Sequence, residues 1–432
     1  MKYNSNFVDI INIGAGPAGL AFACMFDEEI KKNKINFIGK FICLEKYRNS
    51  EWHPNLLLQN TDINHHVYRD LVTPRNPQSP YSFAMYLKEN NRLFKFGLLG
   101  RPASRVEWSD YMKWAAQKLS KYIEYNRVVD YIQPVLKEGV LTSMIIGGNG
   151  FEFETRKIIL SNGSTPYIPT VFNKFIGDRI FHTSSYLKNL QNMKHNLPKR
   201  WLVLGSGQSA GEVVMDLIGK HSDIHVTSLH RSIGFKIAQQ GQFPNLAFLP
   251  EYTDYYRTLS PNKKVAFFQD IKGTNYSGID VDESQQLYSA IYEDEILGRE
   301  RITMEVNSEI NSLDYINNEY VMVIQDKFTG VKKSLFFDAC VIGTGYFQPK
   351  IPALLNHMEA FLEKDYNGDL LIDDEYRIAL SGKPDVFIYI NGLSERTHGI
   401  SNAQSFSAVA LRAEQIYQSI EKHNVLPDNY FI

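Results

Sequence analysis

Two short glycine-rich runs have the residue types and spacing that allow a backbone to bind phosphate. The first, Gly14-Ala15-Gly16-Pro17-Ala18-Gly19, follows a β-rich apolar run and leads into small and apolar residues of helical character. In this GxGxxG pattern Gly14 allows the turn, Gly16 lets a pyrophosphate approach the backbone, and Gly19 lets the helix pack close to the strand. The free N–H groups at the start of the helix then face the phosphates.

An acidic residue ends the next predicted strand. Glu45 follows Phe41-Ile42-Cys43-Leu44 and lies 26 positions beyond Gly19. Its carboxylate can accept hydrogen bonds from the hydroxyls of a ribose. The alternative is a glycine turn in some other α/β fold, but the order of strand, turn and helix favours a dinucleotide site.

The second run, Gly205-Ser206-Gly207-Gln208-Ser209-Ala210, fits GxGxxA and follows a predicted strand at 201–204. The next predicted strand, 224–229, has no acidic residue at its end. His230-Arg231-Ser232 follows it instead, with Lys236 nearby. A basic cluster at this point suits a ribose with a 2′-phosphate, and therefore NADP rather than NAD. The alternative is that Arg231 is a solvated surface charge.

The two fingerprints lie about 190 residues apart, which implies two bound dinucleotides in one chain. Typically the first holds FAD and the second, in an inserted domain, holds NADPH. We therefore predict an α/β fold with two Rossmann-like dinucleotide-binding domains, the FAD domain being discontinuous and the NADPH domain inserted. A small, mostly helical substrate-binding region completes the fold.

Composition is that of a globular protein. The chain has 432 residues, enough for two or three domains, with 44% hydrophobic and 22% charged residues. A net charge of −2 gives no indication of a nucleic-acid or anionic membrane partner. The N-terminus has no apolar signal core and no apolar run could span a bilayer, so we expect a cytoplasmic protein.

Cysteine and histidine usage argues against disulfide and metal chemistry. The three cysteines form no CxxC pair and are expected to pack in the core. The only histidine pair, His65-His66, has no nearby third ligand at a usual spacing, so we expect no metal site.

The predicted boundaries follow the order of the motifs. Residues 1–195 form the first part of the FAD-binding domain, and residues 196–335 form the NADPH-binding domain with a helical substrate-binding segment at about 239–300. Residues 336–432 return to the FAD domain and end in a helix predicted at 405–423. An apolar strand that leads into Gly343-Thr344-Gly345-Tyr346 marks this return.

Between the two fingerprints, residues 47–100 are weakly periodic and rich in proline, asparagine and aromatic side chains. A segment of this length is usually functional or disordered, and its aromatic residues argue against disorder. We expect loops and short helices that wrap a cofactor. A helix at 107–119 and strands at 140–146, 151–160 and 386–391 are also predicted.

In their order along the chain, these motifs resemble the flavin-dependent N-hydroxylating monooxygenases, the ornithine and lysine N-monooxygenases of siderophore biosynthesis. Besides the glycine runs, the resemblance rests on Trp52-His53-Pro54, Arg69-Asp70-Leu71-Val72-Thr73, Ser79-Pro80-Tyr81-Ser82-Phe83, Tyr111-Met112-Lys113-Trp114-Ala115-Ala116, Thr274-Asn275-Tyr276-Ser277, Gly343-Thr344-Gly345-Tyr346 and Thr397-His398-Gly399. It covers nearly the whole chain.

The resemblance implies a reaction. NADPH reduces FAD, O2 adds to form a C4a-hydroperoxyflavin, and this species transfers oxygen to the neutral terminal amine of L-ornithine or L-lysine, for siderophore or other hydroxamate biosynthesis. Such chemistry needs a dry site, with the cofactor supplying the reactivity and the protein supplying position and hydrogen bonds. The family also implies a homo-oligomer, a dimer or tetramer.

Site residues carry over by motif. Asn275, the catalytic candidate, is expected near the nicotinamide ribose and the substrate amine, while Asn245 and Ser407 match positions that hold the amino acid. Arg69 stands where the family usually has a lysine that faces the substrate carboxylate, and its fork suits a carboxylate. Alternatively, Arg69 pairs with an internal acid such as Asp70 or Glu51. Further cofactor-binding candidates in the matched motifs are Trp52, His53, Asn64, Gly345 and Tyr346.

The sequence departs from the family pattern in three places. Pro17-Ala18-Gly19 replaces a proline-phenylalanine-asparagine run, and Ile63-Asn64 replaces a methionine-glutamine pair in the flavin-facing stretch. One residue is inserted between His398 and Ser407, which affects the alignment of Ser407. The alternatives are a diamine N-monooxygenase, a Baeyer–Villiger or sulfur-oxidising flavin monooxygenase, and a catalytically silent flavoprotein. The second lacks its FxGxxxHxxxW run here.

Overall fold

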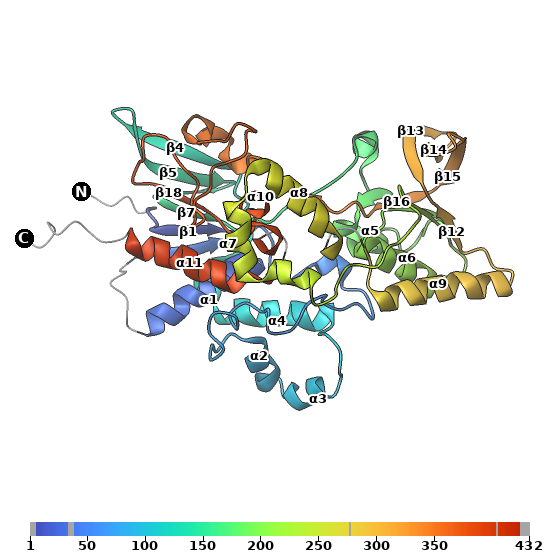
Figure 1. The fold of residues 1–432 in the computed structure, drawn as a ribbon, viewed down its shortest axis with the longest axis horizontal. Coiled ribbons are helices and arrows are strands. Elements are labelled where there is room, and N and C mark those ends of the chain that lie inside the picture. The colour runs from blue at the N-terminus through green and yellow to red at the C-terminus, as the bar shows by residue number, and fades with distance from the viewer. Residues whose placement is uncertain (1–5, 33–38, 276–277, 403–404, 424–432) are drawn as a thin grey trace, which may run out of the picture.

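Two separate parallel sheets organise the molecule (Figure 1). The structure, a computed structural model, describes residues 6–32, 39–275, 278–402 and 405–423. Among these residues, no helix is long and apolar enough to cross a bilayer.

The first sheet has the strand order β18-β7-β1-β2-β3, and all its pairings are parallel. Its strands are β1 (Ile10–Ile13), β2 (Phe41–Leu44), β3 (Ile123–Glu124), β7 (Lys157–Leu160) and β18 (Phe387–Ile390). The helices α1 (Pro17–Lys31) and α11 (Val409–Lys422) pack against each other beside it (Figure 1). Because β18 and α11 come from the end of the chain, this unit is discontinuous, as predicted.

The second sheet has the order β12-β11-β10-β16-β9 and is also parallel. Its strands are β9 (Ile180–His182), β10 (Arg200–Leu204), β11 (His225–Leu229), β12 (Ile302–Glu305) and β16 (Ala339–Ile342). Its helices are α5 (Tyr186–Asn192), α6 (Gln208–Lys220) and α9 (Val281–Ile296). An antiparallel sheet of β13 (Ser308–Ile316), β14 (Glu319–Asp326) and β15 (Lys332–Phe337) extends this unit.

Two chain crossings join the units. β8 (Thr165–Pro166) leaves the first sheet and pairs in antiparallel fashion with β17 (Tyr346–Phe347), which returns to it. The second sheet therefore contains strands from outside residues 196–335, namely β9 before them and β16 after them. We propose that the domain boundaries lie at this crossover rather than at residues 195 and 336.

The predicted single strand at 151–160 is instead two strands in different sheets. β6 (Phe151–Thr155) pairs with β5 (Val140–Gly148), which pairs with β4 (Tyr131–Lys137), while β7 enters the parallel sheet. The change of direction comes at Arg156, between the two apolar runs.

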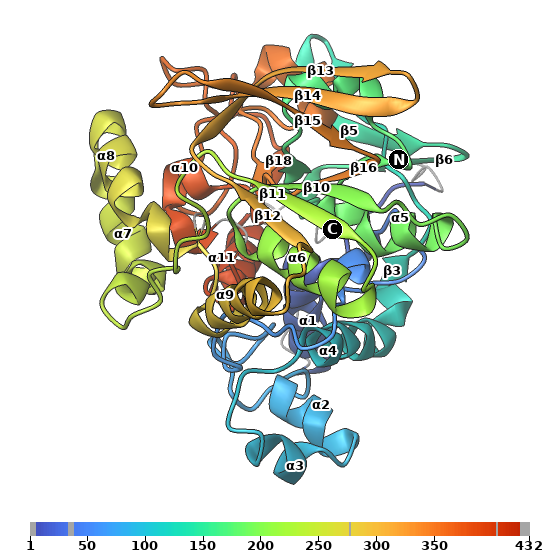
Figure 2. The same cartoon turned by 90° about the vertical axis from the view of Figure 1, so that its right-hand side faces the viewer.

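Helices and short turns cover the two units. The segment at 47–100 is a layer of loops with η1 (Pro54–Leu56), α2 (Phe83–Glu89) and α3 (Leu93–Gly97), as expected, and α4 (Arg105–Lys118) follows. The region at 239–300 is mostly helical, with η5 (Pro244–Phe248), α7 (Pro250–Thr258), α8 (Pro261–Ile271), η6 (Lys272–Thr274) and α9. Figure 2 shows α7 and α8 at one edge of the molecule and α2 and α3 at another.

The remaining short elements lie in the connections. They are η2 (Ser120–Tyr122), η3 (Thr170–Phe175), η4 (Thr183–Ser185), η7 (Ala353–Phe361), α10 (Glu395–His398) and η8 (Ile400–Asn402).

Candidate active site

The first glycine turn has the geometry that a pyrophosphate needs. Gly14 has a φ of +103°, and a Cβ there would lie 2.6 Å from the carbonyl oxygen of Ser161. A Cβ on Gly19 would lie 2.0 Å from the carbonyl oxygen of Gly14, so helix α1 approaches β1 too closely for any side chain. A Cβ on Gly16 would meet nothing within 4 Å, which leaves open space in front of the helix.

Glu45 follows β2 and lies against this turn. Its side chain is 6% exposed, and its carboxylate accepts hydrogen bonds from the backbone N–H of Ala15 at 2.7 Å and of Tyr47 at 2.9 Å. The acid is thus fixed at the carboxyl edge of the sheet beside the open turn, where a ribose would lie.

The second turn repeats the geometry with a different third residue. Gly205 has a φ of +135°, and its Cβ would lie 2.2 Å from the carbonyl oxygen of Gly343, while Gly207 opens onto free space. Ala210 takes the place of the third glycine. It fits because it faces Gly343, where a Cβ would come within 2.8 Å of the Ala210 methyl group.

Gln208, half-buried like Ser209, connects helices rather than standing free at the turn. Its Oε1 accepts the backbone N–H of Asp280 at 2.9 Å, and its Nε2 donates to Glu212 at 3.1 Å. The carboxylate of Glu212 also accepts hydrogen bonds from both terminal nitrogens of Arg105, each at 2.6 Å. This bidentate pair joins α4 of the first unit to α6 of the second.

A neutral histidine and two exposed cations follow β11. His230 is 1% exposed and lies between the hydroxyls of Ser206 and Ser228, at 3.1 and 2.9 Å. Burial lowers the pKa of His230 to about 4. Arg231 and Lys236 are exposed, and neither forms an ion pair with a described residue.

An aromatic cluster lies between the first unit and the start of α11. The ring of Phe406 contacts Trp52 and Trp108 edge-on at centroid distances of 5.5 and 5.4 Å, and His65 at 5.0 Å. His53 lies edge-on to Trp52 at 4.7 Å. Burial lowers the pKa of His65 to about 4, so the ring is neutral.

The neighbouring cofactor candidates take different positions. Asn64 is exposed beside the aromatic cluster. Gly345 and Tyr346 lie at the crossover: the carbonyl of Gly345 accepts a hydrogen bond from His182 Nε2 at 2.9 Å, and the ring of Tyr346 lies edge-on to His182 at 5.1 Å.

Arg69 is half-buried and forms no ion pair with a described residue. Its guanidinium lies over the ring of Phe248, 5.6 Å from the centroid. Asp70 does not pair with it, because its carboxylate accepts the backbone N–H groups of residues 72, 73 and 83. Glu51 lies 3.5 Å from Lys113 instead. The internal pairing of Arg69 is therefore excluded within the described structure.

The segments of the other substrate candidates connect to Arg69 through packing. Phe248 belongs to η5, which also carries Asn245, and it packs with Ile400 and Ile271. The side chain of Asn245 donates to the carbonyl of Gln240 at 2.9 Å.

Asn275 and Ser407 lie a few residues after Ile271 and Ile400, the two residues that pack with Phe248. Asn275 is exposed just after η6, and the motif residues 276–277 lie outside the described residues. Ser407 is 9% exposed, and its hydroxyl accepts a hydrogen bond from the Ser405 hydroxyl at 3.0 Å. Arg69 and Asn245 thus lie on segments that meet at Phe248, and Asn275 follows α8, whose Ile271 packs there. Ser407 lies next to Phe406 of the aromatic cluster.

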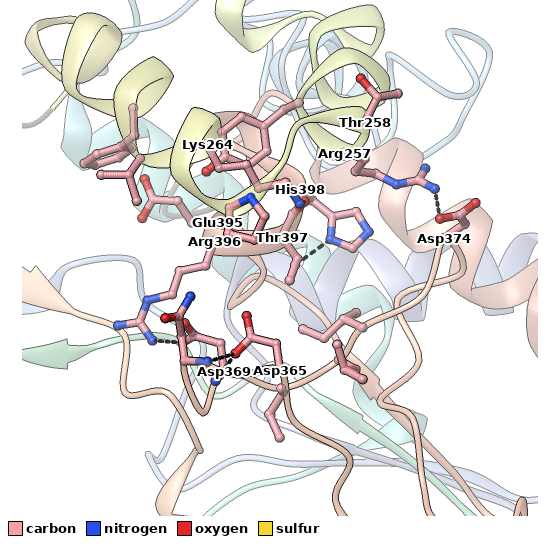
Figure 3. A pocket seen from close by; sticks show the side chains of 18 of the residues that line it. Arg257, Thr258, Lys264, Asp365, Asp369, Asp374, Glu395, Arg396, Thr397 and His398 are labelled. Atoms are coloured by element: carbon pink, nitrogen blue, oxygen red, sulfur yellow. Dashed lines mark hydrogen bonds and ion pairs between the residues drawn. The ribbon is translucent and has the colours of Figure 1, made fainter.

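A cavity of about 870 Å³ has none of the four substrate candidates among its lining residues (Figure 3). It is bounded by α7, α8, the loop at 365–374 and α10. Its arginines are neutralised by the wall, since Arg257 pairs with Asp374, and Arg396 pairs with Asp369 at 2.7 Å. These ion pairs link α7 and α10 to the loop at 365–374.

Two open glycine turns, each at the carboxyl edge of a parallel sheet, define a protein that binds two dinucleotides. The residues fit FAD at the first turn, since Gly16 and Glu45 supply an open backbone and a ribose acceptor, and NADPH at the second. The described residues contain no group of histidine, cysteine or carboxylate side chains that could hold a metal ion. The class is that of two-dinucleotide flavoprotein oxidoreductases.

Comparison with known proteins defines the family. Residues 6–348 match the family of L-lysine 6-monooxygenase/L-ornithine 5-monooxygenase, and the chain belongs to it. It is therefore an NADPH-dependent flavin monooxygenase.

Individual relatives cover almost the whole chain. The crystal structure of L-lysine 6-monooxygenase from Pseudomonas syringae has 47% identity and a TM-score of 0.89, covering 96% of this chain and 100% of that one. L-ornithine N(5)-monooxygenase of Pseudomonas aeruginosa is 29% identical over 96% of this chain and 94% of its own. An ornithine N-hydroxylase from Kutzneria, solved with reduced FAD, NADP+ and L-ornithine, has 28% identity and a TM-score of 0.89, covering 96% and 99%.

Sequence reasoning missed several residues that shape the site. Arg105 and Glu212 form an ion pair although they are 107 positions apart, and no local sequence pattern predicts such a contact. His65 and Phe406 join the aromatic cluster although they are 341 positions apart in the sequence. The helix N-cap at Ser104 could have located the start of α4, but not the partner of Arg105.

Proposed function

We propose that this enzyme N-hydroxylates the terminal side-chain amine of a free amino acid, with L-lysine as the preferred substrate and L-ornithine as the second. The preference for lysine is supported by the higher identity to the lysine enzyme, 47% against 29% for the ornithine enzyme. Bound FAD supplies the redox chemistry, accepting electrons from NADPH and activating O2.

One observation carries the choice of an amino acid over a diamine. Arg69 is a half-buried guanidinium without a carboxylate partner, held over Phe248 beside the η5 segment. A planar fork of this kind binds a carboxylate through two parallel, charge-assisted hydrogen bonds. The α-carboxylate of the substrate supplies the missing anion, and a diamine has none to offer.

The other candidates orient the substrate. Asn245 keeps a side-chain oxygen available because its amide nitrogen is fixed on the carbonyls of residues 240 and 241. Asn275 is exposed after η6 and is assigned to the substrate amine and the nicotinamide ribose. Ser407 lies next to Phe406, so the cluster of Trp52, His65 and Phe406 limits water near the reacting amine.

The test is a product screen with the purified holoenzyme, NADPH and O2. L-lysine, L-ornithine, cadaverine and putrescine are compared for hydroxylamine product, with NADPH consumption and peroxide release measured in the same samples. Product from an amino acid alone supports the proposal. Product from a diamine alone keeps the reaction but refutes the assignment of Arg69. Peroxide with no hydroxylamine from any of the four refutes the proposed substrate class.

Replacing Arg69 separates substrate binding from cofactor chemistry. We expect Arg69→Ala to raise the KM for the amino acid about 30-fold, because one charge-assisted bidentate contact contributes ~2 kcal/mol. NADPH oxidation without substrate should stay close to that of the parent enzyme. Lys113→Ala is the control, since Lys113 is a half-buried cation that already has a carboxylate partner in Glu51. An unchanged KM in Arg69→Ala would remove Arg69 from the substrate site.

The assembly is also part of the proposal. Family membership supports a homo-oligomer, and light scattering of the purified holoenzyme measures its mass directly.

A further inference from the structure

Arg412 is a buried cation whose described partners are all neutral. It lies in the first turns of α11 and is 1% exposed. Its Nε donates to the side-chain oxygen of Asn391 at 2.8 Å, and one terminal nitrogen donates to that of Asn402 at 3.1 Å. Among the described residues, no aspartate or glutamate forms an ion pair with it.

Such an arrangement needs an anion nearby. A buried charge without a counter-charge costs much free energy, whereas a guanidinium stays protonated at any physiological pH. Burial lowers the pKa of Arg412, and the charge that the Tyr376 hydroxyl would carry if ionised acts in the opposite direction. The protein does not provide the compensating charge within the described structure, so a bound ligand is the remaining source.

A chain of buried polar side chains leads from Arg412 to the first glycine turn. Asn391, just after β18, donates from its amide nitrogen to the carbonyl of Ala18 and to the hydroxyl of Ser161, both at 3.0 Å. Ser161, just after β7, donates to Asn12 at 2.6 Å, and Asn12 in β1 donates to the carbonyl of Gly14 at 2.7 Å. These residues lie in or directly after three neighbouring strands.

The guanidinium also lies directly beside the first turn of α1. Gly392 has a φ of +108°, and a Cβ there would be 3.6 Å from a terminal nitrogen of Arg412 and 3.8 Å from the Ala18 methyl group. The positive charge therefore lies close to the same helix start whose N–H groups face the open space at Gly16. Charge and helix dipole act in the same direction on an anion there.

We propose that Arg412 is the buried counter-charge for the pyrophosphate of FAD. It is a positioning residue that acts through Asn391 and the first turn of α1, without touching the phosphates. The inference rests on FAD binding and not on the proposed substrate, so its failure would leave the N-hydroxylation proposal unaffected.

The experiment compares Arg412→Met with Arg412→Lys in the full-length protein. The dissociation constant of FAD and the thermal midpoint, with and without added FAD, are measured for each variant. We expect Arg412→Met to weaken FAD binding at least tenfold and to lose most of the midpoint increase that FAD produces. Without FAD, the thermal midpoint of Arg412→Met should match that of the parent protein. Removing an uncompensated buried charge need not destabilise the fold. Arg412→Lys supplies an ammonium group that a bound pyrophosphate would keep protonated, so it should recover part of the FAD affinity lost in Arg412→Met.

Tyr376→Phe is the matched control. The Tyr376 hydroxyl donates to the same oxygen of Asn402 at 2.9 Å, so this variant removes a neighbouring hydrogen bond and leaves the charge in place. A purely structural role of Arg412 predicts that Arg412→Met loses stability equally with and without FAD, or fails to fold while Tyr376→Phe folds. Either result overturns the proposal.

The flavin midpoint potential localises the effect. A charge that acts on the pyrophosphate affects oxidised and reduced FAD alike, so the two-electron equilibrium should change less than tenfold, which corresponds to about 30 mV. A larger change with unaltered FAD affinity would place the action of Arg412 at the flavin ring and overturn the assignment to the pyrophosphate.

Discussion

The two glycine turns share a backbone but carry side chains of different charge. Gly14 and Gly205 both have positive φ values, and Gly16 and Gly207 both open onto free space. In the first turn, the buried carboxylate of Glu45 accepts a backbone hydrogen bond. In the second, the neutral ring of His230 is hydrogen-bonded to the turn, and an exposed arginine follows it directly.

The difference separates two tasks that a dinucleotide site performs. Backbone N–H groups and the helix dipole bind the phosphates, and they require only the turn. We expect the residue after the next strand to distinguish the riboses, since a carboxylate accepts hydrogen bonds from ribose hydroxyls and repels a 2′-phosphate, whereas a cation attracts it. One backbone solution thus serves two cofactors with a change of side chain.

The third small residue of each turn, Gly19 in the first and Ala210 in the second, provides the sharpest test of this similarity. We expect the largest effect on cofactor binding and stability here. In Gly19→Ala the new methyl group would lie 2.0 Å from a backbone oxygen, so α1 must move away from β1. We expect loss of bound FAD, seen as loss of flavin absorbance in the purified protein, and a destabilisation of ~3 kcal/mol or more.

Ala210→Gly is the matched change in the second turn. Here Gly343 already makes room for the methyl group, so the substitution only adds backbone freedom and should cost about 1 kcal/mol with FAD retained. Equal losses in the two variants would show that the turns do not differ in helix–strand distance.

Arg231 tests the electrostatic half of the comparison, with an intermediate effect. We expect Arg231→Ala to lower the preference for NADPH over NADH, as the ratio of kcat/KM values, by about five- to thirtyfold. Lys199→Ala is the control, because this exposed lysine of the same unit lies 3.4 Å from Asp223. An equal preference in Arg231→Ala and the parent would refute the phosphate role.

The sequence could predict those parts of the fold whose causes are local. The turns at Gly14 and Gly205 follow from small residues at fixed spacing, and the positive φ values of both glycines agree with the prediction. The layer at 47–100 follows from its proline and aromatic content. The prediction of a single strand at 151–160 was wrong. Two apolar runs separated by Arg156 look continuous in the sequence, but they enter different sheets.

Long-range contacts account for what the sequence could not predict. β9 and β16 belong to the second sheet only because they pair with each other and with β10, so the extent of that sheet depends on pairing rather than composition. The isolation of Arg69 was likewise open in the sequence, because Asp70 could have paired with it. Asp70 is instead occupied by backbone N–H groups, and only the folded chain brings these donors to its carboxylate.

His230 provides the smallest test and concerns only the second turn. Its pKa in the folded protein is about 4, below the usual value of 6.5, so between these pH values the unfolded chain binds more protons. The contribution of the neutral ring to stability is therefore complete above pH 6.5 and declines as the pH falls toward 4. We expect His230→Asn to lower the thermal midpoint by a few degrees at pH 7 and by clearly less at pH 5.

The control is Ser206→Ala, which removes one hydroxyl partner but keeps the titrating ring. Its loss of thermal midpoint should therefore depend less on pH. A deficit of His230→Asn that is the same at both pH values would mean that the ring is not held neutral, and the contrast between the two turns would then fail.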